Sequence, residues 1–169
     1  MTDTGQSESP DQAPKAGRAI DRLLDEYGES HQNETNKAVH WVCVPVIVWT
    51  VIALLWALPH PFGGIPLLNW GTILLVLSLG YYVKLSPPLA VGFAIFAAAC
   101  IGIIVAYQSI TSFPLWQTAL GVFVLAWIGQ FWGHKVEGKK PSFFKDVQFL
   151  MIGPAWLMSF LYKKLGISY

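Results

Sequence analysis

The chain has 169 residues, of which 54% are hydrophobic and 12% are charged, and this is more apolar content than the core of a soluble domain of that length requires. Its net charge of +1 and the lack of a basic stretch interleaved with aromatic residues exclude nucleic acid as an expected partner. Both cysteines, Cys43 and Cys100, lie in apolar segments with no Cys-x-x-Cys pair, so we interpret them as packing residues of a membrane protein.

The N-terminal segment is polar at first and then amphipathic. Residues 1–16 contain prolines and no apolar core, so we expect a disordered tail rather than a signal peptide, followed by a single membrane domain at 17–169. In residues 17–31 the charged residues avoid one helical face, which carries Ile20, Leu24, Tyr27 and His31. This pattern predicts an amphipathic helix against the bundle or the membrane surface, with His31 pointing inward.

Four apolar runs come next, each long enough at about 1.5 Å per residue to cross most or all of a hydrocarbon core of about 30 Å. They lie at about 38–58, 67–83, 89–107 and 115–133. A further stretch, 147–162, contains Gly153-Pro154, so we expect it to be broken there and to be re-entrant or interfacial. The predicted fold class is all-α, a polytopic membrane helical bundle with about four transmembrane helices.

The basic residues predict the orientation of this bundle. All eleven lysines and arginines fall on one side of a four-span topology. The loops near 59–66 and 108–114 contain no charged residue. Because cytoplasmic loops carry the excess of basic residues, we expect both termini in the cytoplasm.

Three of the four histidines, His31, His40 and His134, fall on the cytoplasmic side, and His60 falls in an opposite loop. In one unbroken helix the separation of nine positions between His31 and His40 would turn their side chains to opposite faces. The segment between them contains good N-cap residues, namely Asn33, Thr35 and Asn36. We therefore predict a helix-turn-helix corner at 32–35 that lets both imidazoles face one pocket.

The fourth span ends in a polar stripe of Trp127, Gln130, His134 and Glu137. Three imidazoles and one or two carboxylates suit a first-row transition metal such as Fe(II), with open positions for oxygen and substrate. Asn36 and Gln130 would orient the imidazoles. The spacing also leaves open a structural reading, in which interfacial histidines and amides cap helix ends and bond one another.

Two motifs at opposite ends of the chain resemble those of the Mpo-type family of short multi-span membrane proteins. The first is Tyr27-x3-His31-x4-Asn36-x3-His40, followed by Pro45. The second is Gly129-Gln130-x2-Gly133-His134-x2-Glu137-x3-Pro141, with Gly153-Pro154 near the end. The resemblance covers about residues 17–166.

This resemblance implies an Fe(II)-dependent 2-hydroxy fatty acid dioxygenase that shortens long-chain acids by one carbon in fatty acid α-oxidation, with O2 and membrane lipid as its other partners. It implies iron ligation by His31, His40 and His134, with Glu137 as a ligand or a supporting residue. The resemblance to short bacterial members also implies the bacterial inner membrane, with a cytoplasmic active site. Further candidates for supporting or substrate contacts are Tyr27, Asn36, Gln130, Lys135 and Asp146.

Two other functions are compatible with the same residues. A bis-histidine haem protein for electron transfer would use two of the histidines as axial ligands. A non-enzymatic lipid-binding protein would use the polar cluster only for structure, and it would bind no stoichiometric metal.

Overall fold

The computed structural model describes residues 18–61, 65, 67–139 and 148–169, and the regular structure in these ranges is helical. The expected disordered tail, 1–16, lies outside them. The elements are α1 (Ala19–Gly28), α2 (Glu34–Trp56), α3 (Trp70–Leu85), α4 (Pro87–Ile110), α5 (Leu115–Glu137) and α6 (Gln148–Leu165). Helices α2, α4 and α5 are long and apolar enough to cross a membrane, and α3 is a shorter apolar helix. The predicted all-α membrane bundle is confirmed.

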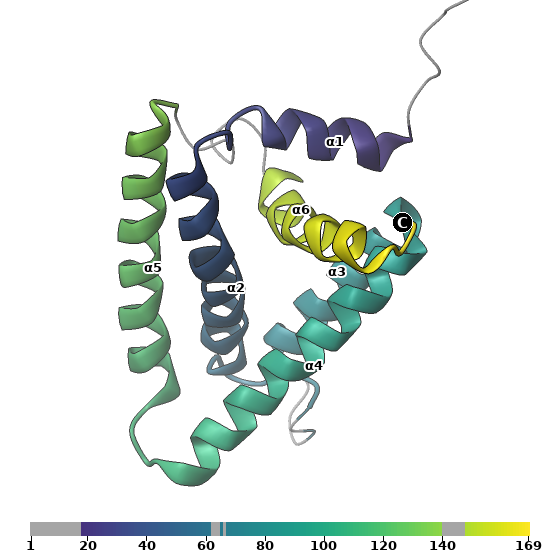
Figure 1. Ribbon diagram of the computed structural model, residues 1–169. Coiled ribbons are helices and arrows are strands. Elements are labelled where there is room, and N and C mark those ends of the chain that lie inside the picture. Colours follow the sequence, from purple (N-terminus) through teal and green to yellow (C-terminus); the bar gives the residue numbers. More distant parts are fainter. Residues whose placement is uncertain (1–17, 62–64, 66, 140–147) are drawn as a thin grey trace, which may run out of the picture.

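Helices α2 and α5 lie side by side, and the start of α2 is next to the end of α5 (Figure 1). Two glycines on α5 permit this close packing. A Cβ atom on Gly129 would lie 2.8 Å from the Cys43 sulfur, and one on Gly133 would lie 2.6 Å from the Asn36 side-chain oxygen. Small residues four positions apart let membrane helices approach closely, and here they bring the end of α5 against the first turns of α2.

Helix α1 lies across the end of the bundle where α2 begins and α5 ends (Figure 1). Its buried residues are Ile20, Leu24 and Tyr27, as the amphipathic pattern predicts. After α1 the chain turns sharply, and the Asn33 side chain caps α2 by accepting hydrogen bonds from the backbone N–H groups of Thr35 and Asn36, at 2.9 and 3.4 Å. A corner between the two helices is confirmed, but it lies at 29–33 and not at 32–35, because Glu34 and Thr35 already belong to α2.

Helix α6 packs against α1 and α4 and also contacts α2. The prediction of a break at Gly153-Pro154 is wrong, because Pro154 lies inside a continuous helix. Neighbouring helices hold this segment: the Tyr82 hydroxyl donates to the Met151 carbonyl at 2.5 Å, and the Tyr162 hydroxyl donates to the Pro88 carbonyl at 2.6 Å. Contacts of this kind allow a membrane helix to tolerate a proline.

The helix ends also set the positions of polar residues. Helix α5 continues four residues beyond the predicted span and stops at Gly138, whose φ of 75° is the left-handed conformation that favours glycine at a helix end. His134 and Glu137 therefore both lie in the last helical turn, at the end of the bundle that α1 covers.

Candidate metal centre

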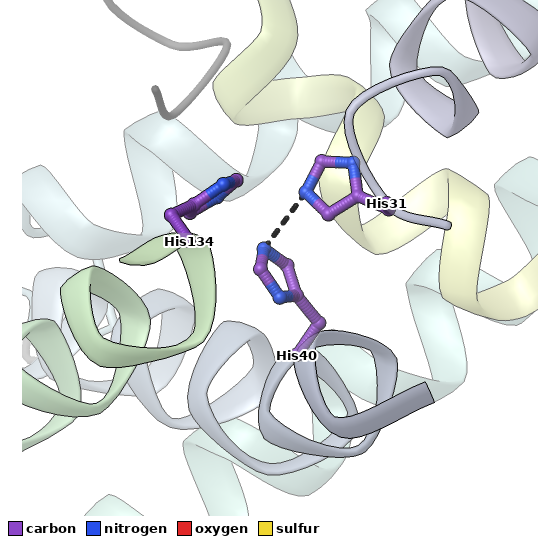
Figure 2. Close-up of side chains that lie close together, drawn as sticks. All are labelled: His31, His40 and His134. Atoms are coloured by element: carbon purple, nitrogen blue, oxygen red, sulfur yellow. Dashed lines mark hydrogen bonds between the residues drawn. The ribbon is translucent and has the colours of Figure 1, made fainter. Parts of the chain in front are cut away.

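Three histidines meet at the end of the bundle where α1 turns into α2 and α5 ends. His31 lies in the corner between α1 and α2, His40 lies early in α2, and His134 lies in the last turn of α5 (Figure 2). One ring nitrogen of each lies within 4.8 Å of the others, and the Nε2 atoms of His31 and His40 are 2.9 Å apart. All three side chains are buried. We call this group the histidine cluster.

Backbone contacts determine which nitrogen carries the proton in two of these rings. The Nδ1 atom of His31 lies 2.6 Å from the Tyr27 carbonyl oxygen, and that of His40 lies 2.9 Å from the Asn36 carbonyl oxygen. Because a carbonyl only accepts hydrogen bonds, each Nδ1 must carry the proton and donate it. In the neutral rings both Nε2 atoms therefore present lone pairs, and these face each other across 2.9 Å.

Two facing lone pairs repel each other unless a cation lies between or beside them. Burial lowers the pKa of His31 to about 4, although the bond to the Tyr27 carbonyl opposes that shift, so a proton is a poor candidate for this cation at neutral pH. Two nitrogens bound at right angles to one metal ion lie about 3.0 Å apart, given a metal–nitrogen distance of about 2.1 Å. The arrangement of His31 and His40 therefore fits a metal ion.

Other buried polar atoms at this end of the interface between α2 and α5 also have unused hydrogen-bonding capacity. Among the described residues, Asn36 Oδ1, Gln130 Oε1 and His134 Nδ1 have no hydrogen-bond partner. Buried polar atoms in proteins are nearly always paired, with protein, water or an ion. Their presence beside the histidine cluster indicates a site that is completed by a bound species.

Glu137 supports the corner that carries His31. Its carboxylate accepts hydrogen bonds from the backbone N–H groups of Gln32 and Asn33, at 2.9 and 2.8 Å, and from the Asn36 side-chain amide at 3.2 Å. Both carboxylate oxygens are thus engaged by α2 and the residues just before it. The groups that converge within metal-binding distance in the described part of the chain are the three histidines, without Glu137.

Aromatic rings enclose the His31 side of the cluster. The Tyr27 ring stacks on His31, with centroids 4.2 Å apart and planes 11° apart. The Trp156 ring of α6 lies 5.2 Å from the His31 ring. This contact was not predicted from the sequence. The available signal was the helical spacing of Ile152, Trp156 and Ser159, which are all buried on α6.

A small cavity lies directly against the cluster, and we call it the histidine cavity. Its volume is about 50 Å³, and its lining includes Tyr27, His40, Val44, Gln130 and His134. One water needs about 10–15 Å³ measured in this way, so the cavity has room for a few small groups.

The remaining sequence candidates lie elsewhere. Lys135 is exposed, and Asp146 lies outside the described residues. Another lysine, Lys139, donates a hydrogen bond to the Glu29 carbonyl at 2.6 Å, which ties the end of α5 to the segment just after α1.

Comparison with known proteins gives one match. Residues 18–165 match a family model described as 2-hydroxy-palmitic acid dioxygenase Mpo1-like. No curated protein and no solved structure matches the chain.

Proposed function

The chain belongs to the 2-hydroxy-palmitic acid dioxygenase Mpo1-like family, and we propose that it is an Fe(II)-dependent dioxygenase that shortens long-chain 2-hydroxy fatty acids by one carbon. The observation that best supports a bound metal ion is the pair of facing Nε2 atoms on His31 and His40, with His134 beside them. We place the site at the cytoplasmic end of a bacterial inner-membrane protein.

The donor set supports iron as the metal. Neutral imidazole suits Fe(II), and three protein ligands on one side leave positions for oxygen and substrate. His31, His40 and His134 would hold the ion, which would supply the capacity to activate O2. Carbonyl groups of Tyr27 and Asn36 fix the ring tautomers of His31 and His40, as partners of metal-bound imidazoles usually do.

The histidine cavity suits the polar head of a 2-hydroxy acid. This head is a carboxylate with an adjacent hydroxyl, which is compact enough for a space of about 50 Å³. Gln130 lines that space, and its buried Oε1 has no partner among the described residues. We propose that the Gln130 amide hydrogen-bonds the substrate head and helps to orient it, because an unpaired buried amide gains most from a polar ligand.

The haem alternative is disfavoured by the same geometry. Axial histidines of a haem lie on opposite faces of the macrocycle, with their nitrogens about 4 Å apart and the ring between them. The Nε2 atoms of His31 and His40 are 2.9 Å apart, and the adjoining cavity of about 50 Å³ is far too small for the ring.

Metal analysis of the detergent-purified protein tests the proposal. We expect about one iron per chain in the wild type after Fe(II) is added, with oxygen uptake that depends on 2-hydroxyhexadecanoate. The variants His40→Ala and His134→Ala should lose both. His60→Ala is the matched control, because His60 is exposed in the loop after α2, and it should keep both.

Two results would overturn the proposal. A folded wild-type protein without bound metal and without oxygen uptake would leave the lipid-binding alternative. Iron retained in both cluster variants would show that the histidine cluster is not the metal site.

A further inference from the structure

A large apolar groove runs along the bundle next to the histidine cavity. Helices α2, α4 and α6 form it, and its volume is about 550 Å³. Its lining is almost entirely hydrophobic and includes Trp41, Val44, Ile95, Ala99, Leu157 and Met158. We call it the apolar groove.

The apolar groove and the histidine cavity share a wall. Val44 lines both spaces. Of two successive residues on α6, Gly153 lines the cavity and Pro154 lines the groove. A Cβ atom on Gly153 would lie 3.6 Å from Val44 and 3.1 Å from the Tyr27 hydroxyl. The wall at this point is therefore thin, because position 153 has no side chain, but it is closed, because even a Cβ atom there would be in van der Waals contact with Val44.

The sizes and linings of the two spaces match the two parts of a 2-hydroxy fatty acid, its polar head and its acyl tail. The histidine cavity, at about 50 Å³, accommodates a polar head but not a long acyl chain. The groove has roughly ten times that volume and an apolar lining. Two other pockets near α1 are lined by charged residues such as Asp25 and Lys163, where an acyl chain would gain little.

We propose that the apolar groove holds the acyl tail of the 2-hydroxy acid, and that its head reaches the histidine cavity across the thin wall at Val44 and Gly153 once the Val44 side chain rotates aside. This inference rests on the proposed function, which identifies the ligand as a 2-hydroxy acid. It adds the tail site, and it makes the α4 wall of the groove a determinant of chain-length preference.

Photochemical labelling locates the tail without turnover. The probe is 2-hydroxyhexadecanoate with a diazirine in the distal half of its chain, added to the iron-loaded protein without oxygen so that the acid is not consumed. We expect label on the groove faces of α4 and α6, around Ile95, Ala99 and Met158, and we expect excess unlabelled 2-hydroxyhexadecanoate to remove most of it. Excess phospholipid should not.

A pair of matched variants tests chain-length preference. Ile95 lines the groove and Leu125 lies on α5, and both side chains are 68% exposed. Ile95→Trp should lower kcat/KM for 2-hydroxyhexadecanoate roughly tenfold, the cost of losing about two buried methylene groups. Its kcat/KM for 2-hydroxyoctanoate should stay within about twofold of the wild-type value. Leu125→Trp should change neither value, and both variants should retain iron.

The outcomes separate this inference from the proposed reaction. Label in the groove that the unlabelled acid does not displace would show that membrane lipid fills it, and label on other helices would place the tail elsewhere; either result overturns the inference even if oxygen uptake is normal. Displaceable label in a protein that binds no iron would instead refute the reaction and leave the tail site standing.

Discussion

Glu137 shows how one side chain determines the position of another without touching the cavity. Its two oxygens accept three hydrogen bonds from Gln32, Asn33 and Asn36. These residues lie between His31 and His40, so the carboxylate fixes the corner that sets the distance between the two rings. A carboxylate also stabilises the N-terminal end of α2, where backbone N–H groups have no helical partner.

We predict that Glu137→Ala lowers metal affinity by about tenfold to a hundredfold, which is typical when a residue that orients metal ligands is lost. The three donors would lose their acceptor, and His31 would move relative to His40. Metal titration of the purified variant measures the effect. Glu34→Gln is the control, because the Glu34 side chain is 91% exposed in a surface ion pair with Lys37 and such pairs contribute little. Unchanged affinity in Glu137→Ala would refute the supporting role.

The residues of the site differ in how far sequence alone could predict them. His31 and His40 were predictable because the capping preference of Asn33 predicts a turn between them, and His134 was predictable because the four-span topology places it at the same end of the bundle. The contacts of Glu137 were not, because its partner Gln32 lies 105 residues away in the sequence and no local rule relates them. Of the two roles left open for Glu137, ligand or supporting residue, we propose the supporting one, because its carboxylate bonds to the corner.

At the scale of helices, the packing of α5 on α2 carries His134 to the other histidines. Gly133 is a point of close approach, since a Cβ atom there would lie 2.6 Å from Asn36 Oδ1 and 3.2 Å from the Val39 side chain. Asn36 belongs to the helical turn that precedes His40, and Gly133 directly precedes His134. Any separation of the helices at this point would therefore open the histidine cluster.

We predict that Gly133→Ala destabilises the protein by about 1–3 kcal/mol, the usual cost of overpacking, and weakens iron binding. Thermal unfolding in detergent and metal titration measure the two effects. Gly121→Ala on the same helix is the matched control, because a Cβ atom at Gly121 would meet nothing within 4 Å. If both alanine variants retained wild-type stability and iron, the close contact would have no bearing on the site.

The α6 helix shows why the sequence did not predict that Trp156 contacts His31. Proline normally interrupts a helix, and the expected break at Pro154 left no helical register for the residues after it. Contacts from Tyr82 and Tyr162 to backbone carbonyls keep this segment packed. These contacts come from α3 and from α6 itself onto α4, so they depend on tertiary structure that the local sequence does not contain.

At the scale of the whole molecule, the histidine cluster constrains the membrane topology. The cluster joins the start of α2 to the end of α5, so both points lie on the same side of the membrane. The number of crossings from α2 through α5 must then be even. Helices α2, α4 and α5 are each long and apolar enough to span. If all three cross, α3 must cross as well, although its 16 residues extend only about 24 Å.

Four crossings predict, independently of charge, that the turns at Ser86 and Gly138 share one side and that the turns at Ala57 and Thr111 share the other. With the orientation that the basic residues predict, fusions of alkaline phosphatase, which is active only outside the cytoplasm, should be active after Ala57 and Thr111 and inactive after Ser86 and Gly138. The basic residues predict this orientation because lysines lie close to the turns at Ser86 and Gly138. Activity after both Ala57 and Ser86 would mean that α2 crosses and α3 does not; α5 would then end on the side opposite the start of α2, and the histidine cluster could not form in the membrane.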